Sequence, residues 1–255
     1  RPDMGVQIYG SMDWGTLARF YVLDTRQYRS PQVCPNPPTL QRCDLEKGRK
    51  ILFGGAGGGA YVNPLASPCR EALADPARTV LGTEQEQWLD GALAASGAAW
   101  NVIAQNVMIN AVIEGTAESP RIFTDSWGGY PPARERFFAS LLKRRAANPV
   151  VLTGDIHCFW ACDLANAAGR PVAVELVVSS IATTTYDKSA YLPLNPGAKW
   201  HDGLHNGYMR CELNRERLRT DVVAIDNRED PRSGRSVLAT FDVKSGDPHV
   251  HRVTS

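Results

Sequence analysis

The sequence lacks both a long apolar run and a marked net charge. No uninterrupted apolar stretch reaches the roughly 20 residues that a bilayer-spanning helix requires, so we expect no transmembrane segment. The formal net charge is +1 at pH 7, and nothing in the charge pattern favours nucleic acid or an anionic membrane surface. A signal peptide is absent too. The chain opens at Arg1 without a methionine, which is typical of a processed chain or of a piece of a longer one.

Cys-x-x-Cys pairs are also missing, although the chain has six cysteines. Cys34, Cys43 and Cys69 lie in polar, proline- and glycine-rich surroundings where a buried thiol would be unusual. This pattern favours disulfide bonds in an oxidising compartment over a zinc site. We expect at least one disulfide among these three cysteines, with Cys34 and Cys43 as the favoured pair. We expect Cys158 and Cys162 to be buried beside the site.

Residues 30–80 show no helical or strand periodicity, because prolines and glycines interrupt the segment throughout. The glycine run from 54 to 59 does not resemble a phosphate-binding loop, since the Lys-Ser/Thr ending is missing and no strand precedes a helix around it. We interpret this region as a surface loop insertion held by cysteines. At 255 residues, 43% of them hydrophobic, the rest of the chain can bury a sizeable core.

Helical and strand patterns alternate through the middle of the chain. Thr83 and Glu86 form a capping-box pattern at the start of an apolar stripe with helical spacing. A buried strand at 100–105, an amphipathic helix at about 132–146 and an apolar strand from Val150 follow. This order indicates an α/β sheet with crossover helices. Further strands are expected within 6–29, as a pair joined at 10–15, and at 173–178, 207–213, 218–225 and 237–243, the last of the chain.

Asp155 and His157 follow the apolar run that ends in Gly154. Open α/β sheets place their chemistry at the carboxyl ends of such strands. A carboxylate and a neutral imidazole at this spacing are able to bind one metal ion or two adjacent ones. A strand that ends in an ordinary polar turn, with Gly for the bend and Asp as a turn former, explains the same residues equally well.

Two further segments carry polar side chains that suit a site. Asp24, Arg26 and Arg29 end the second predicted strand, and the planar fork of arginine fits phosphate oxygens. An ion pair of Asp24 with either arginine, pinning a loop, is an equal alternative. The loop at 123–131 combines Asp125 with Trp and Tyr, which is typical of a site wall. Its aromatic side chains would equally serve to pack the loop onto the core.

Four segments occur in an order that resembles the C-terminal part of PhoD-type alkaline phosphatases, which are calcineurin-like metallophosphoesterases. The segments are Leu23–Arg29, Asp125–Tyr130, Leu152–His157 with Trp160, and Gly207–Cys211. The resemblance covers nearly all of residues 1–255 apart from the cysteine-containing insertion at about 30–80. It implies a four-layer α/β/β/α sandwich, of which this chain is the C-terminal half, with a multinuclear metal site at the strand ends.

The resemblance implies metal-dependent hydrolysis of phosphate monoesters and diesters, with Ca²⁺ and Fe³⁺ and two or three metal ions in the site. Asp155 and His157 are the expected metal ligands, and Arg26 is expected to grip the phosphate oxygens, with Asp24 orienting it. Related enzymes usually have Gly-His-x-His where this chain has Gly154–His157. A carboxylate in place of an imidazole makes the site harder, which favours calcium or ferric iron over zinc.

The same resemblance assigns residues to the substrate side of the site. Gln105 takes the position where relatives have a metal-binding histidine, so we expect its amide to act as a weak ligand or to bond to phosphate. Asp125, Trp127 and Tyr130 are expected to line the mouth of the pocket. Asn206 takes the place of the arginine that relatives often carry before Gly-Tyr, so the resemblance does not extend to the substrate-side loop.

The family's upstream metal ligands, its Asp-Asp-His-Glu stretch and its Asn-Asn pair have no counterpart in this sequence. We therefore expect an N-terminal segment of the same precursor to complete the fold and to supply Asp, Asn and His ligands. The resemblance also implies export to the periplasm or secretion. The alternative is an exported, non-catalytic binding module derived from this fold. Metal content separates the two, because a full site holds two or three ions and a degenerate module none or one.

Overall fold

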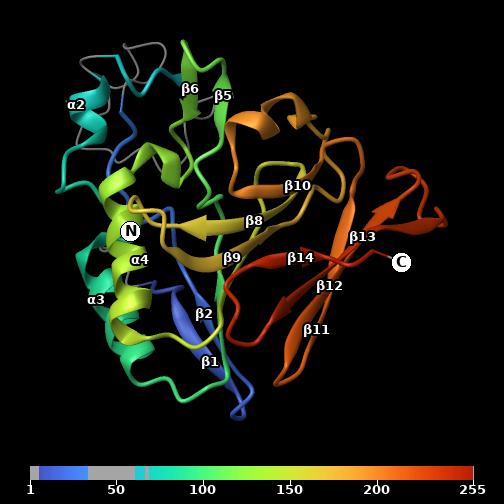
Figure 1. Ribbon diagram of the computed structural model, residues 1–255, viewed down its shortest axis with the longest axis horizontal. Coiled ribbons are helices and arrows are strands. Elements are labelled where there is room, and N and C mark those ends of the chain that lie inside the picture. The colour runs from blue at the N-terminus through green and yellow to red at the C-terminus, as the bar shows by residue number, and fades with distance from the viewer. Residues whose placement is uncertain (1–5, 34–60, 67–68, 255) are drawn as a thin grey trace.

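A seven-stranded mixed sheet is the centre of the fold in the computed structural model, which describes residues 6–33, 61–66 and 69–254 (Figure 1). Its strands lie in the order β1-β2-β4-β7-β9-β8-β10. The four strands β2, β4, β7 and β9 run parallel, and antiparallel pairs complete both edges. The bounds are β1 Gly10–Trp14, β2 Ala18–Val22, β4 Trp100–Ala104, β7 Pro149–Thr153, β8 Phe159–Ala165, β9 Pro171–Val177 and β10 Ala198–Asp202.

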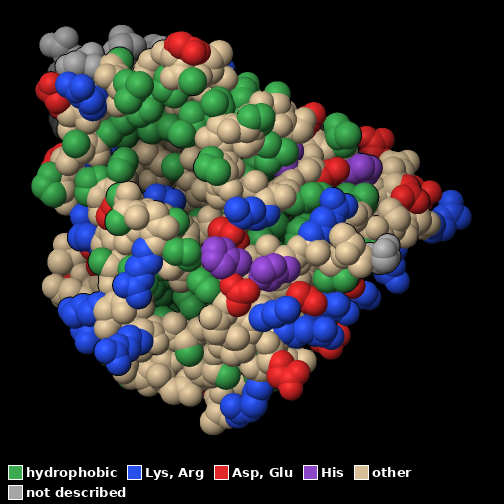
Figure 2. Space-filling model, in the orientation of Figure 1, with side chains coloured by type: hydrophobic (Ala, Val, Ile, Leu, Met, Phe, Trp, Pro, Cys, Tyr) green, Lys and Arg blue, Asp and Glu red, His purple; other side chains and the backbone are tan. Residues whose placement is uncertain are grey.

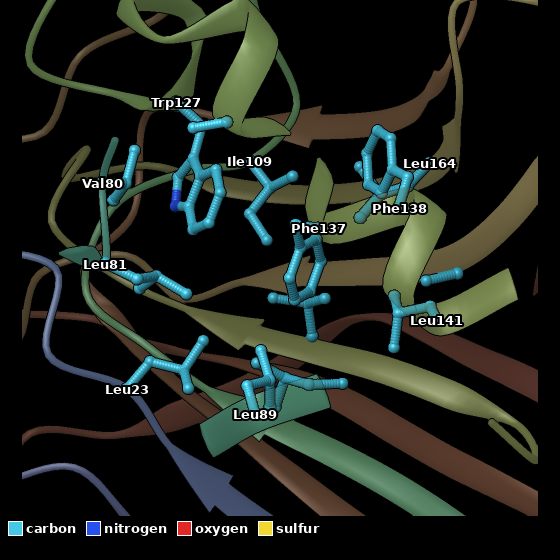
Figure 3. Close-up of a cluster of buried hydrophobic side chains, with 14 of the residues drawn as sticks. Leu23, Val80, Leu81, Leu89, Ile109, Trp127, Phe137, Phe138, Leu141 and Leu164 are labelled. Carbon is cyan, nitrogen blue, oxygen red and sulfur yellow. The ribbon is translucent and has the colours of Figure 1, made fainter. Parts of the chain in front are cut away.

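Two helices, α3 (Gly82–Ala94) and α4 (Pro131–Arg144), form a layer on one face of this sheet. They bury an apolar stripe against the strands because their apolar residues recur at helical spacing. Figure 3 shows Leu89 of α3 and Phe137, Phe138 and Leu141 of α4 in this cluster. Figure 2 shows basic side chains on the part of the surface that α4 occupies, and the last turn of α4 contains Lys143 and Arg144.

A four-stranded antiparallel sheet packs on the opposite face, so the layers run α/β/β from left to right in Figure 1. Its strands are β11 (Gly207–Leu213), β12 (Arg217–Ile225), β13 (Arg235–Lys244) and β14 (Val250–Arg252). Val222 and Phe241 meet Val102 and Val174 of the central sheet in a second buried cluster. These are three of the layers expected for the sandwich, and the α/β prediction is confirmed.

A small third sheet contains β3 (Tyr61–Val62), β6 (Pro120–Phe123) and β5 (Ile113–Gly115). Of these strands, β3 lies within residues 30–80, which were expected to be loop, and the helix α2 (Cys69–Leu73) lies there too. β5 and β6 lie further along the chain, before α4. Residues 34–60 lie outside the described residues, and the Cys34–Cys43 pairing lies there too. No helix in the described ranges is long and apolar enough to cross a membrane.

The β1–β2 end of the central sheet presents apolar side chains to solvent. Met12 pairs with Phe20 in the hairpin, and Gly10 pairs with Val22, so these side chains share one face. Trp14 is 67% exposed, and Met12 and Val22 are exposed as well. The apolar cluster beneath the four-stranded sheet reaches Ala18 and Phe20 but leaves this end uncovered.

Two local predictions were wrong. Residues 10–14 form strand β1 rather than the predicted turn, which lies at Gly15, where a positive φ of 55° suits glycine. The capping box of Thr83 with Glu86 does not form either. Instead the hydroxyl of Thr79 accepts a hydrogen bond from the Gly82 backbone N–H at 2.9 Å and donates to Glu86 at 2.5 Å. The helix is thus capped by Thr79, three residues before the first helical residue, Gly82.

Six strands of the described residues were not predicted. β3 lies in the segment 30–80, β5 and β6 lie between the predicted strand at 100–105 and the predicted helix at about 132–146, and β10 lies between the predicted strands at 173–178 and 207–213. β14 follows β13, which was expected to be the last strand. β8 was not assigned because its residues do not alternate: positions 159–162 are all buried, since the strand is covered on both faces.

Candidate functional site at the carboxyl ends of the parallel strands

The guanidinium of Arg26 connects two carboxylates at the carboxyl ends of the parallel strands. Arg26 follows β2, and its Nη1 donates to Oδ1 of Asp125 at 2.8 Å. Its Nη2 donates to Oδ1 of Asp155, which follows β7, at 3.2 Å. The structure therefore brings together three of the residues that the sequence placed at the site. The Arg26 side chain is 25% exposed and that of Asp155 is 41% exposed, so both remain accessible.

Asp125 is more enclosed than Asp155 and has more partners. Besides Arg26, its Oδ1 pairs with Nη1 of Arg29 at 2.5 Å and accepts from Nε2 of Gln32 at 2.8 Å. Arg29 is buried. Asp125 thus serves as the anchor for two arginines, while Asp155 faces solvent. Sequence reasoning did not assign Arg29 and Gln32 to this cluster, although Arg29 belongs to the same motif as Arg26.

Asp24 acts on the backbone of the arginine loop rather than on a guanidinium. Its Oδ1 accepts from the backbone N–H of Arg26 at 2.9 Å and of Gln27 at 3.0 Å. Within the described part of the chain neither Arg26 nor Arg29 pairs with Asp24, so that alternative was wrong. The arginines turn to Asp125 and Asp155 instead. The other carboxylate oxygen of Asp24, Oδ2, is buried and has no hydrogen-bond partner among the described residues.

The backbone that carries Asp155 and His157 is strained. Both residues have a positive φ, 73° and 59°. The N–H of Ile156 donates to the carbonyl of Gly154 at 2.9 Å, which closes a γ-turn around Asp155. Left-handed conformations of this kind cost on the order of 1–2 kcal/mol per non-glycine residue and persist where the surroundings enforce them. Two such residues in three positions point to a segment shaped for its side chains.

The imidazole of His157 lies against the ring of Tyr186. The ring centroids are 5.7 Å apart and the planes differ by 17°. In the described ranges the ring nitrogens of His157 make no hydrogen bond to protein. Asp155 and His157 therefore present an oxygen and an imidazole at one strand end. Across residues 6–33, 61–66 and 69–254, however, no group of three or more His, Cys, Asp or Glu side chains is arranged to hold a metal ion.

Gln105 does not face the site. Its Nε2 donates to Oγ1 of Thr153 at 2.7 Å, and its Oε1 accepts from the Val107 N–H at 3.1 Å and from Nε1 of Trp127 at 3.2 Å. The side chain is buried and both ends of the amide are committed to protein partners. The expectation of a weak ligand or phosphate partner is corrected accordingly.

Trp127 and Tyr130 pack the loop onto the core instead of lining a pocket mouth. Both are 1% exposed. The ring centroids of Trp127 and Phe137 are 5.3 Å apart, and Figure 3 shows both side chains in the buried cluster. The hydroxyl of Tyr130 donates to the carbonyl of Ser30 at 2.8 Å. The alternative of aromatic anchors was the correct one. A tryptophan or tyrosine in a polar loop gives no sign of which way it points, so the sequence did not decide between the two.

Glu175 stabilises the strand end that carries the site, and sequence reasoning did not identify it. It lies within β9, is fully buried, and accepts from the N–H groups of Ile109 and Asn110 at 2.8 Å and from the hydroxyl of Thr153 at 2.7 Å. Burial raises the pKa of Glu175. Thr153 is the last residue of β7, so this network fixes the strand end that carries Asp155.

We expect Glu175→Gln to lower the free energy of unfolding by about 1–3 kcal/mol, because one amide N–H would face a buried backbone N–H donor. Urea unfolding of the variant and the wild type measures the difference. Glu135→Gln, on the more exposed side of α4, is the matched control. A loss within about 0.5 kcal/mol, the usual range for surface changes, would contradict the role of this network.

Comparison with known proteins places the chain in a family. The fold is that of the metallophosphoesterase sandwich, with an arginine, two carboxylates and a histidine at the strand ends. The family model for PhoD-like phosphatases matches residues 1–222, and the chain belongs to this family. It is 32% identical over 264 residues to alkaline phosphatase D of Bacillus subtilis (strain 168), covering 100% of this chain and 40% of that relative.

A solved structure described as "Structure of PhoD" agrees at the level of three-dimensional structure. The TM-score is 0.79 at 31% identity, over 98% of this chain and 44% of that one. The resemblance to the C-terminal part of PhoD-type phosphatases is confirmed. The chain spans about two fifths of the length of the relatives that it matches.

Proposed function

We propose that this chain supplies the phosphate-gripping side and two metal ligands of a metal-dependent phosphoesterase that hydrolyses phosphate monoesters or diesters. One observation carries the proposal: the Arg26 guanidinium lies between Asp125 and Asp155 at the carboxyl ends of the parallel strands. This edge is where α/β sheets bind ligands. Membership in the PhoD-like phosphatase family supports the same reaction.

Arg26 is suited to phosphate because one of its nitrogens is held firmly and the other loosely. Nη1 bonds to the enclosed Asp125 at 2.8 Å, whereas Nη2 makes the longer contact of 3.2 Å to the exposed Asp155. An arriving phosphate competes with Asp155 for Nη2 without displacing the Asp125 anchor. Arg29, on the other side of Asp125, offsets the charge of that carboxylate and leaves Arg26 able to act as a cation toward substrate.

Asp155 and His157 would hold a metal ion. The donor set fits, since Asp155 is exposed with one oxygen on Arg26 and the His157 nitrogens bond to no residue in the described part of the chain. A carboxylate next to an imidazole suits a hard cation, in line with Ca²⁺ and Fe³⁺ as the family's ions. Bound metals would offset the charge of the phosphate and activate the attacking water. Displacement of the Asp155–Arg26 contact would free Arg26 for the phosphate.

A further segment of the same precursor is proposed to complete the site. Calcium takes about 6–8 oxygen ligands, and the described residues offer one carboxylate and one imidazole. The exposed apolar side chains Met12, Trp14 and Val22 provide a surface for such a segment, and a lone chain rarely leaves one uncovered. We expect the segment to carry Asp, Asn and His ligands and to bury more than about 2,000 Å² in all, as obligate partners do.

Export, to the periplasm or outside the cell, is part of the proposal. Cys69, which is disulfide-bonded, supports an oxidising compartment. Cys158 and Cys162 are free and fully buried, as expected. Burial raises the pKa of the Cys158 thiol to about 12, so it is not a nucleophile of the site.

The second candidate is an exported, non-catalytic binding module. The small number of metal donors in the described ranges favours it. Metal analysis of the purified full-length protein, with hydrolysis of a generic phosphodiester in parallel, distinguishes the two. Two or three ions together with turnover support the enzyme. One ion or none, with no turnover, would favour the binding module.

A further inference from the structure

The loop between β9 and β10 places one aromatic side chain at the candidate site. Tyr186 belongs to this loop, and its ring stacks on the imidazole of His157. Aromatic pairs of this geometry lie within the range of favourable ring contacts. Tyr186 is nevertheless 52% exposed, so a large part of the ring is open to a molecule bound beside His157. None of the protein's described hydrogen bonds uses its hydroxyl group.

A buried ion pair holds this loop two residues further on. Nζ of Lys188 pairs with Oε1 of Glu114 in β5 and donates to the hydroxyl of Tyr61 in β3 at 3.0 Å. The Lys188 and Glu114 side chains are only 12% and 8% exposed. Burial alone would lower the pKa of Lys188, but the hydrogen bonds to Glu114 and Tyr61 raise it, so the lysine stays charged. An ion pair enclosed to this degree fixes geometry more firmly than a surface pair.

The backbone around Tyr186 is fixed as well. The Lys188 N–H donates to Nε2 of His201 at 2.9 Å. This bond assigns the proton of the neutral ring to Nδ1, which donates to the Phe159 carbonyl at 3.0 Å. Gly203 packs so closely that a Cβ there would lie 2.1 Å from the Tyr186 carbonyl oxygen. The position of Tyr186 over His157 is therefore set by contacts to the strands β5, β8 and β10 and not by the loop alone.

We propose that Tyr186 is a specificity-determining residue that stacks on the organic group of the phosphate ester and favours aromatic groups, and that Lys188 positions it. The inference rests on the proposed function, because it places the phosphate beside His157 and Arg26. An ester bound there extends its organic group away from the metal ligands and along the open part of the Tyr186 ring. Aromatic stacking of this kind is worth about a twofold to tenfold change in affinity.

Binding of two phosphonates tests the proposal without the complication of leaving-group reactivity. Phenylphosphonate and methylphosphonate share the phosphate-like head and differ in the organic group, and calorimetry on the full-length, metal-loaded protein gives both dissociation constants. We expect the wild type to prefer phenylphosphonate by about twofold to tenfold. Tyr186→Leu is expected to lose that preference, and Tyr186→Phe, which keeps the ring, is expected to retain it.

Lys188→Met tests the positioning role, with Tm measured in parallel. The preference for phenylphosphonate is expected to fall as it does in Tyr186→Leu. A lower Tm with the wild-type preference intact would show that Lys188 is merely structural and would overturn its part of the proposal. An unchanged preference in Tyr186→Leu would overturn the role of Tyr186 while leaving the proposed function in place. If the wild type bound neither phosphonate, the proposed function would fail and this inference with it.

Discussion

Replacing His157 by alanine is expected to lower phosphodiester hydrolysis by more than about a hundredfold, since loss even of a group that only supports a metal ligand costs about 10–100-fold. The imidazole lies beside Asp155 at the end of the central strand and makes no hydrogen bond to any residue that the structure describes, so its removal takes away a proposed metal donor. Metal content should fall with activity. The measurements are steady-state hydrolysis and metal analysis of the purified, full-length variant.

Folding should survive this substitution. His157 contacts Tyr186 at the surface of the site, and alanine at its positive φ costs on the order of 1 kcal/mol. His157→Asn, which tolerates the left-handed backbone better, separates backbone strain from loss of the imidazole. His251→Ala, at an exposed position of strand β14, is the matched control and should leave metal content unchanged. Wild-type turnover and metal content in His157→Ala would show that the ligand assignment is wrong.

Arg26→Lys is expected to reduce kcat/KM by about 10–100-fold, although the charge is kept. Lysine places one ammonium group where the guanidinium offers a planar fork, so it is unable to hold the Asp125 anchor and a phosphate oxygen at once. Loss of a hydrogen bond to a charged group costs about 1.5–3 kcal/mol, which corresponds to this range. Steady-state kinetics with a phosphodiester gives kcat and KM separately.

Arg19→Lys provides the control for Arg26→Lys. Arg19 lies near the amino end of β2, the strand that precedes Arg26, and uses two nitrogens on the single carboxylate of Asp13, at 2.6 and 3.0 Å. The Arg19→Lys variant should keep kcat/KM near the wild-type value. If Arg26→Lys also left both constants unchanged, Arg26 would serve only to pin the loop through its carboxylate partners.

The arrangement at the strand ends was predictable from the sequence because it follows from sheet geometry. Two apolar runs end at Leu23 and at Thr153, and polar residues follow each of them. Runs of this kind belong to parallel strands, and parallel strands bring their carboxyl ends to one edge of the sheet. Arg26 and Asp155 had to meet there once both strands lay in one sheet. The helices α3 and α4 were predictable for a related reason, since their apolar residues recur at a spacing that only a helix presents on one face.

The missed parts of the site depend on contacts between segments that lie far apart in the chain. Glu175 reads as a polar residue in an apolar strand, and only the fold shows that it bonds to Ile109, Asn110 and Thr153. Gln105 was predicted to take the position of a metal ligand, yet its amide bonds to Thr153 and Trp127, which no local pattern reveals.

The short strands β5, β6 and β14 were missed for a similar reason. Each has 3 or 4 residues, so pairing with a neighbour, rather than intrinsic preference, makes them strands.

The central claim is that the metal site is shared between this chain and a further segment of its precursor. Metal content and phosphodiester turnover of residues 1–255 expressed alone, set against the full-length protein, test it most directly. The account predicts an aggregated or metal-poor, inactive product from residues 1–255, and a full-length protein that carries two or three ions and turns over substrate. A monodisperse, metal-loaded and fully active product from residues 1–255 would contradict it.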